Sequence, residues 1–170
     1  GYSGRFSDLQ KIIEQSNKVK SVYTGGLIDK ITAGRVQYLE SMSALIEQIQ
    51  YAHSRGILLE IALNASCGVK DKSNKEWWND ITRYIKELEA VGVDGVIVTH
   101  PFIMEIVKSH TKMQLTASTI CEITTARSAL YYEKFGADII TPSVNSNMSM
   151  EELKLMKKTL TRGRLRLLVN

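Results

Sequence analysis

The chain has 170 residues, of which 44% are hydrophobic and 24% are charged, a composition typical of a soluble globular domain. No apolar run reaches the roughly 18 residues that a membrane span requires, and no secretory signal pattern opens the chain. The net charge of +4 is compatible with an anionic or RNA partner but does not select one. Cys67 and Cys121 lie far apart without metal-type spacing, so we expect reduced thiols in a cytoplasmic protein with no membrane contact.

The first part of the chain predicts a helix, a strand and a second helix. Residues Ser7–Asn17 carry apolar side chains at helical spacing, and Ser7 itself can cap this helix. Val19–Tyr23 follows as a short apolar strand. Residues 27–40 show no period and predict a long loop. Ser41 can cap the next helix.

From residue 57 onward, apolar strands and amphipathic helices alternate. Ile57–Leu63 is almost wholly apolar, as expected of a strand that is buried on both faces of a parallel sheet. Gly92 ends one helix, Pro101 can begin the next, and Ser149 can cap the last. The predicted elements are a polar loop to residue 74, helix 74–91, strand 96–99, helix 101–109, strand 113–117, helix 124–135, strand 137–141, helix 150–160 and strand 165–169.

This order predicts an α/β protein of βα repeats, with a parallel sheet wound by right-handed crossovers. A complete eight-fold βα barrel needs about 250 residues, so a barrel of this length would be incomplete. Residues 1–170 are predicted to form a single domain that is a fragment of a longer protein. Its sheet would have two open edges, which proteins normally cover. We therefore expect a homo-oligomer or association with the missing barrel segment.

Small polar residues follow the predicted strands at their carboxyl ends. In parallel α/β sheets these ends gather on one face, where binding and catalytic sites are built. Cys67 could act there as a nucleophile or ligand, although a buried apolar role is the stronger interpretation. The candidate substrate-binding residues at these ends are Asn64, Ser66, Cys67, His100, Ser118 and Thr141.

The three histidines have different predicted roles. His100 is either a proton carrier near neutral pH or a structural residue that hydrogen-bonds to the backbone, and the sequence leaves both interpretations open. His53 is predicted to pack among apolar neighbours on a helix, and His110 is predicted to be a solvated loop residue.

Arginines supply the candidate anion-binding groups. Arg35 lies in the long loop and could close over a carboxylate or phosphate, although a plain exposed arginine is the alternative. Arg162, Arg164 and Arg166 alternate with other residues and would share one face of a strand. An RNA site there is weakly supported, because few aromatic residues lie between them. Contact with solvent or with helix carboxylates is the stronger interpretation.

Several segments resemble the collagenase-like peptidase family, whose catalytic type is unassigned. The segment YAHSRGILLEIALNASC at Tyr51–Cys67 resembles a family helix that feeds a strand ending in "LN". Leu88–Pro101, with the sequence LEAVGVDGVIVTHP, resembles the next helix–strand junction, and Gln114–Arg127 resembles the following strand and helix. The final LRLLVN is similar to a strand that in many members runs into a cysteine-bearing loop.

The resemblance implies a TIM-like barrel and a peptidase that acts on a peptide or a small anionic substrate. It also implies an alternative, because related proteins are oxygen-independent hydroxylases of RNA bases or ubiquinone that carry an iron–sulfur cluster. Their cluster cysteines would lie beyond Asn170, so no cofactor is expected within this chain. Of the family's glycine-and-arginine loop, only Gly34–Arg35 is present. A noncatalytic binding module is therefore the third hypothesis.

Overall fold

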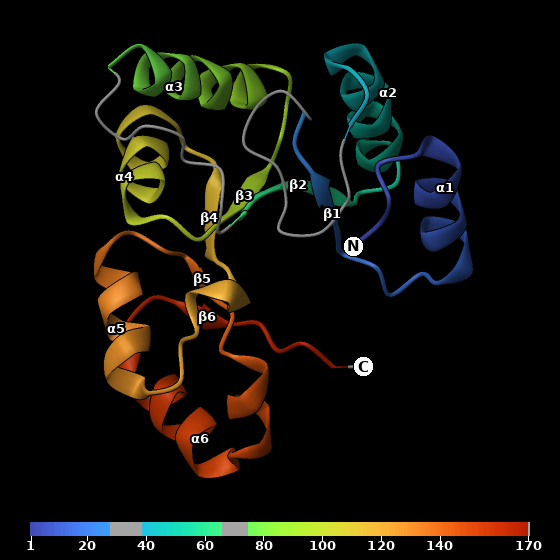
Figure 1. Ribbon diagram of the computed structural model, residues 1–170. Helices are drawn as coiled ribbons and strands as arrows, with labels where there is room; N and C mark the ends of the chain where they lie inside the picture. Colours follow the sequence, from blue (N-terminus) through green and yellow to red (C-terminus); the bar gives the residue numbers. More distant parts are fainter. Residues whose placement is uncertain (28–38, 66–74, 170) are drawn as a thin grey trace.

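In the computed structural model, helices and strands alternate along the whole chain (Figure 1). The structure describes residues 1–27, 39–65 and 75–169. The strands are β1 (Ser21–Gly25), β2 (Leu58–Leu63), β3 (Gly95–Val98), β4 (Gln114–Ala117), β5 (Ile139–Ile140) and β6 (Arg164–Leu165). The helices are α1 (Phe6–Gln15), α2 (Met42–His53), α3 (Lys75–Ala90), α4 (Pro101–His110), α5 (Ala126–Lys134) and α6 (Met150–Thr159), with short 3₁₀ turns η1 (Thr119–Cys121) and η2 (Val144–Met148).

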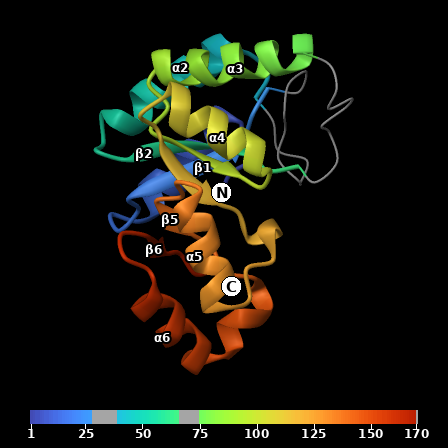
Figure 2. The ribbon, with the colours of Figure 1, turned by 90° about the vertical axis from the view of Figure 1, so that its left-hand side faces the viewer.

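The six strands form one parallel sheet in sequence order, β1-β2-β3-β4-β5-β6. Each strand therefore pairs with the next one along the chain, as in a barrel of right-handed βα units. Figures 1 and 2 show the helices on the outer face of a curved sheet. Within the described residues β1 and β6 are its two edge strands and do not pair with each other. The α/β class and the incomplete TIM-like barrel predicted from the sequence are confirmed.

An ion pair across the inner face shows how strongly the sheet curves. Arg166 follows β6, and its guanidinium donates to both carboxylate oxygens of Glu60 on β2, at 2.8 and 2.9 Å. Three strands separate β2 from β6 in the sheet order. The two side chains can meet only because the sheet curls around its inner face, as barrel strands do when they tilt and stagger.

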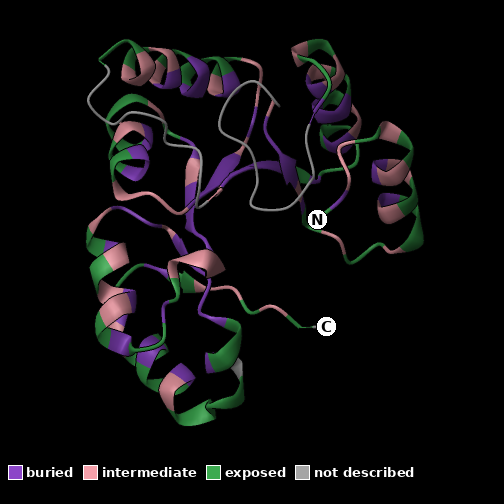
Figure 3. Ribbon diagram, viewed as in Figure 1, coloured by how far each residue is buried: buried purple, intermediate pink, exposed green. Residues whose placement is uncertain are grey.

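The main core lies between the sheet and the helices. Leu59, Ile61, Val96, Leu115 and Ile140 project from the strands into this layer and are fully buried. Figure 3 shows buried residues on the sheet and on the helix faces turned toward it, with exposed residues on the opposite helix faces. None of the described helices is long and apolar enough to cross a membrane.

A short sequence pattern recurs where helices lead into strands. Gly92 and Gly136 end helices with φ of +100° and +102°, a left-handed conformation that favours glycine. Two residues later, Asp94 and Asp138 accept backbone N–H bonds of 2.8 Å from the neighbouring strands. The Gly-x-Asp pattern therefore plays the same structural role at two of the helix–strand junctions.

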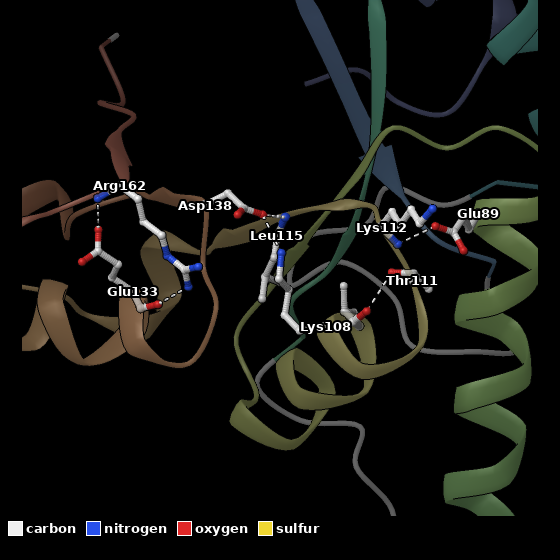
Figure 4. Close-up of polar contacts among 9 residues, drawn as sticks. Glu89, Lys108, Thr111, Lys112, Leu115, Glu133, Asp138 and Arg162 are labelled. Carbon is white, nitrogen blue, oxygen red and sulfur yellow. Dashed lines mark hydrogen bonds and ion pairs between the residues drawn. The ribbon is translucent and has the colours of Figure 1, made fainter.

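A basic residue completes each of these junctions, and it comes from the helix one βα unit earlier in the chain. His53 Nε2 lies 2.8 Å from Asp94 Oδ2. Lys108 Nζ lies 3.0 Å from Asp138 Oδ2, and Figure 4 shows this second pair. The prediction that His53 packs among apolar neighbours is therefore wrong. The His53 side chain is 41% exposed, because its position on α2 faces Asp94 at the start of the next strand and not the core.

The entry to β6 is organised around one buried carboxylate. Glu133 of α5 accepts hydrogen bonds from the backbone N–H groups of Thr161, Arg162 and Gly163. Burial alone would raise the pKa of Glu133, but these N–H donors and the Thr161 hydroxyl outweigh it and lower the pKa to about 2. Arg162 also donates to the Glu133 carbonyl oxygen at 3.0 Å (Figure 4).

Some predicted boundaries are wrong, for identifiable reasons. Ser7 lies inside α1, which begins after Arg5 and has no side-chain cap. Ser3 instead organises this turn, since its hydroxyl donates to Asp8 and accepts from the Arg5 N–H. β5 and β6 pair over two residues each, because strand length depends on a partner that apolar pattern alone does not reveal. Ser41 and Ser149 do cap their helices as predicted.

Candidate functional site

The inner face of the sheet carries a row of neutral polar residues at the carboxyl ends of the strands. Side chains alternate between the two faces of a strand. Ala62, Ile97 and Ile139 are buried but do not belong to the main core cluster, and Thr116 lies between the core residues Leu115 and Ala117 on β4. These four residues therefore face inward, as do the residues two positions further along each strand. The resulting row, called the polar row below, consists of Asn64, Thr99, Ser118 and Thr141.

Hydrogen bonds assemble part of the polar row. Asn64 Nδ2 donates to Ser118 Oγ at 2.9 Å, which connects the ends of β2 and β4 across β3. Thr99 Oγ1 donates to the Asn64 carbonyl oxygen at 3.2 Å. Ser118 Oγ also accepts the N–H of Ile120 and so caps η1. Asn64 and Thr99 are partly exposed, whereas Ser118 and Thr141 are buried.

Thr141 joins the row through the backbone. Its N–H donates to the Ala117 carbonyl oxygen at 3.0 Å, which continues the β4–β5 pairing by one residue. Of the candidate residues predicted from the sequence, the structure therefore brings Asn64, Ser118 and Thr141 together. The sequence analysis did not select Thr99, although it occupies the same strand-end position before His100.

His100 lies apart from the polar row. It precedes α4, where Pro101 takes the first helical position. Its ring stacks on Phe102 at 5.6 Å between centroids and lies 6.3 Å from the ring of Trp78 on α3. We call these three rings the aromatic cluster, and they gather on the outer-helix side of β3. His110 is the exposed last residue of α4 and not a loop residue as predicted.

Three predicted site residues lie outside the part of the chain that the structure describes. These residues are Arg35, Ser66 and Cys67. Their roles as substrate-binding groups stay predictions.

The three C-terminal arginines do not all share one strand face, so the prediction is wrong for Arg162, whereas Arg164 and Arg166 line the same hollow. Arg162 precedes β6 and bonds to the carbonyl of Glu133 on α5. Arg166 turns inward to Glu60, a strand carboxylate and not a helix carboxylate. Arg164 is exposed at the start of β6. The alternation of side chains applies from the start of β6 at Arg164, and Arg162 lies before the strand.

Glycine at position 95 allows β3 to lie close to the β4 backbone, next to the ion pair. A Cβ atom at Gly95 would lie 2.9 Å from the Gln114 carbonyl oxygen and 3.5 Å from Glu60 Cγ. The first distance is shorter than real Cβ contacts allow. The Glu60 side chain is 3% exposed, and Arg166 compensates its buried charge.

A serine and a carboxylate that sequence reasoning did not select lie beside the polar row. Ser143 Oγ donates to Glu122 Oε2 at 2.6 Å, which ties the loop after β4 to the loop after β5. Glu122 has φ of +50°, a left-handed conformation that is rare for residues other than glycine. Ser143 is 1% exposed, so its hydroxyl cannot reach a substrate in this geometry. The pair therefore acts here as a tie between loops.

Cys121 has the properties of a structural thiol. Its Sγ donates weakly to the carbonyl oxygens of Val98 and Thr99, both at 3.7 Å. Burial raises the pKa of Cys121 to about 11, so the thiolate needed for a nucleophile or metal ligand is disfavoured. Among residues 1–27, 39–65 and 75–169, no three His, Cys, Asp or Glu side chains are gathered to hold a metal ion. The described residues thus do not fit an iron–sulfur cluster.

Known proteins share both the sequence pattern and the fold. The family model of peptidase family U32 matches residues 4–166. The uncharacterized protease MJ1657 of Methanocaldococcus jannaschii is 22% identical over 181 residues, which cover 99% of this chain and 54% of that protein. The present chain thus spans about half the length of this curated relative.

Two solved structures have a similar fold. The U32 peptidase Mk0906 superposes with a TM-score of 0.79 at 19% identity, over 95% of this chain and 64% of its own chain. A GH113 β-1,4-mannanase gives a TM-score of 0.54 at 13% identity, over 95% of this chain and 63% of its own. Since the family match extends over nearly all of the βα units described above, the chain belongs to peptidase family U32, the collagenase-like peptidases that its sequence resembles.

Proposed function

We propose that this chain is the barrel module of a peptidase and that its peptide substrate binds over the polar row. The hydrogen bond between Asn64 and Ser118 carries this proposal, because it joins two strand ends into one preassembled surface. Sites of TIM-like barrels lie at this end of the strands. Membership of family U32 supports peptides as the substrate class.

The chemistry of the polar row favours a peptide over a small anion. All four residues of the row are uncharged. Asn64 and Thr99 are partly exposed and offer amide and hydroxyl groups to a substrate, whereas Ser118 and Thr141 are buried, and Ser118 holds the Asn64 amide in place. Such groups match the N–H and carbonyl groups of a peptide backbone. A small anion would require a cation, which Arg35 would have to supply from the loop. The row can bind and orient a peptide, whereas the described residues supply no accessible nucleophile paired with a base.

The same proposal places the protein in the cytoplasm. Cys121 is a free thiol, as is usual in a reducing compartment. A preparation that shows Cys121 in a mixed or intermolecular disulfide under native conditions would contradict this location.

Substitution of Asn64 in the intact protein tests the proposed site. We expect Asn64→Ala to lower kcat/KM for a fluorogenic peptide by about 10-fold or more, since the surface loses one substrate-facing amide and its bond to Ser118. Asn79→Ala is the matched control, because Asn79 is exposed on the outer face of α3. Wild-type turnover in Asn64→Ala, with an unchanged melting temperature, would contradict the proposed site.

His100→Ala separates the two interpretations of this residue. If His100 carries a proton, kcat should fall and one limb of the pH–rate profile should disappear. If it acts only within the aromatic cluster, the melting temperature should fall while the pH profile keeps its shape. The geometry favours the second result, because His100 stacks on Phe102 away from the polar row.

A further inference from the structure

A groove lies between the helices α3 and α4 on the outer side of the sheet. The two helices pack side by side (Figure 1), and the groove between them has a volume of about 300 Å³. It lies between two outer helices, so it is a different site from the polar row at the strand ends. The lining residues that matter for the argument are Trp78, Thr82, Phe102, Glu105, Ile106 and Ser109.

Aromatic surface is exposed at one end of this groove. Phe102 is 59% exposed, although His100 stacks on it at 5.6 Å between ring centroids. Trp78 contacts Phe102 edge to face, with the centroids 5.9 Å apart. The faces of aromatic rings carry partial negative charge and attract cations within about 6 Å of the ring centroid. This end of the groove therefore suits a flat cationic group.

A carboxylate lies beside the aromatic surface. Glu105 is exposed, and within residues 1–27, 39–65 and 75–169 it forms no ion pair. Lys108, three positions further along α4, is paired with Asp138 instead. Glu105 follows Phe102 by three positions, so both side chains lie on the same face of the helix, one turn apart. A cation on the Phe102 ring is therefore also within reach of a carboxylate that has no other partner.

The hydroxyl groups of the groove distinguish between kinds of cation. Thr82 donates its proton to the Trp78 carbonyl oxygen at 2.8 Å, which leaves the Thr82 oxygen as an acceptor, and Ser109 supplies a second hydroxyl. A guanidinium has five N–H donors in one plane, so it can lie on a ring while it donates to a carboxylate and to hydroxyl oxygens. A lysine ammonium has no flat face, and a quaternary ammonium has no donors. The lining therefore matches arginine best.

The size of the groove favours a peptide over a second copy of the chain. On α4 the lining extends from Phe102 to Ser109, about two helical turns. This is far less surface than the roughly 1,200 Å² or more that a stable protein–protein interface buries. A volume of about 300 Å³ is instead at the lower end of the range for small-molecule sites. The groove thus suits one long side chain with a short length of backbone.

We propose that the groove between α3 and α4 binds an arginine side chain of a peptide, with its guanidinium between the Phe102 ring and the Glu105 carboxylate. Ile106, which is partly exposed beside Glu105, packs against the aliphatic stem of this arginine. The inference concerns a surface outside the polar row and does not depend on peptidase activity.

Short peptides test the inference on the 170-residue chain itself. The probes are end-capped pentapeptides that carry arginine, lysine or citrulline between glycines, and tetramethylammonium as a small cation. The chain has two tryptophans, and Trp78 lines the groove, so a titration of intrinsic fluorescence reports binding there. We expect the arginine peptide to bind at least about 10-fold more tightly than the citrulline peptide, which has the same shape without the charge. It should bind about 3-fold more tightly than the lysine peptide.

Two substitutions of exposed residues assign the binding to the named groups. Glu105→Gln should weaken the arginine peptide by about 10-fold and leave the citrulline peptide unchanged. Phe102→Leu keeps an apolar side chain without a ring and should weaken the arginine peptide by about 3-fold. Glu87→Gln is the matched control, because Glu87 is exposed on α3 and does not line the groove.

Three results would overturn the inference. The first is equal binding of the arginine and citrulline peptides, and the second is an arginine affinity that Glu105→Gln leaves unchanged. The third is tighter binding of tetramethylammonium than of the arginine peptide, which would assign the groove to quaternary ammonium ligands. Size-exclusion chromatography provides one more check. A dimer that Glu105→Gln dissociates would assign the groove to a second copy and would likewise overturn the inference.

Discussion

Glu60 and Arg166 are 106 residues apart in the chain, yet they form a two-point ion pair at 2.8 and 2.9 Å across the inner face. The carboxylate comes from the second strand and the guanidinium from the end of the sixth. The pair therefore reports the curvature of the entire sheet, because any flattening would separate the two groups. It also explains how a buried carboxylate is tolerated inside the barrel.

We first predict that Arg166→Met destabilises the protein by about 2–3 kcal/mol, because it leaves Glu60 as a buried charge without its partner. Arg166 is 28% exposed on its side chain, so the loss should be smaller than for a fully buried pair. The measurement is urea unfolding followed by circular dichroism. Arg164→Met is the control and should change stability by less than about 0.5 kcal/mol.

The double variant Glu60→Leu/Arg166→Met distinguishes the charge from packing. Replacing both partners by apolar groups should restore much of the stability lost in Arg166→Met. If the double variant is as unstable as the single one, the ion pair's charge does not account for the loss.

The second prediction concerns the pH dependence that Glu133 contributes. Its pKa is lowered from 4.5 to about 2, so the folded state binds fewer protons than the unfolded state between these values. The stabilisation from Glu133 is therefore complete above about pH 4.5 and is lost as the pH falls through 2. Unfolding of the wild type at pH 7, 4 and 3 should show this loss begin below pH 4.5.

Glu133→Gln should remove that dependence. At pH 7 we expect Glu133→Gln to lower the free energy of unfolding by about 2–3 kcal/mol. The reason is that the glutamine NH₂ group would face backbone N–H donors whose hydrogen bonds the carboxylate accepts in the wild type. The difference from wild type should shrink as the pH falls toward 3. A constant difference across this pH range would show that the hydrogen-bonded carboxylate does not control the effect.

The third prediction concerns two buried hydroxyls. Thr24 and Thr116 are fully buried, and within the described residues their Oγ1 atoms have no hydrogen-bond partner. Thr24→Val and Thr116→Val should each raise the free energy of unfolding by about 1 kcal/mol, because valine keeps the shape and removes an unsatisfied polar group. Thermal and urea unfolding of each variant measure the change.

Thr125→Val is the matched control for these two variants. The Thr125 side chain caps α5 by accepting the Ser128 N–H, so the same substitution should destabilise by about 1 kcal/mol. A loss of stability in Thr116→Val would indicate that its hydroxyl has a partner in solution, such as a bound water.

The fourth prediction concerns the reactivity of Cys121. Burial raises its pKa to about 11, so at pH 8 only a small fraction is thiolate. Modification by a soluble disulfide reagent should therefore be slower than for free cysteine by about 10-fold or more, and it should accelerate in urea. Peptide mass mapping identifies the modified residue. Modification of Cys121 in the native protein at the rate of free cysteine would contradict the raised pKa and the partial burial of this thiol.

Local sequence was sufficient for much of the fold. The apolar run of Ile57–Leu63 and the serine caps at 41 and 149 predicted β2 and two helix starts, since these signals depend on near neighbours. Asn64, Ser118 and Thr141 were placed at strand ends for the same reason, and parallel strands brought them onto one face. Thr99 was not predicted as a site residue, because Thr99 and His100 both follow the strand directly and no local pattern shows which of the two belongs to the site.

The sequence by itself determined the alternation of strands and helices, because periodicity and capping act over a few residues. Only the tertiary structure decided which side chains meet across the sheet. The pairing of Arg166 with Glu60, of His53 with Asp94 and of Ser143 with Glu122 depends on curvature and on loop paths. Such contacts join residues that are distant in the chain, and no local pattern records how far a sheet curls.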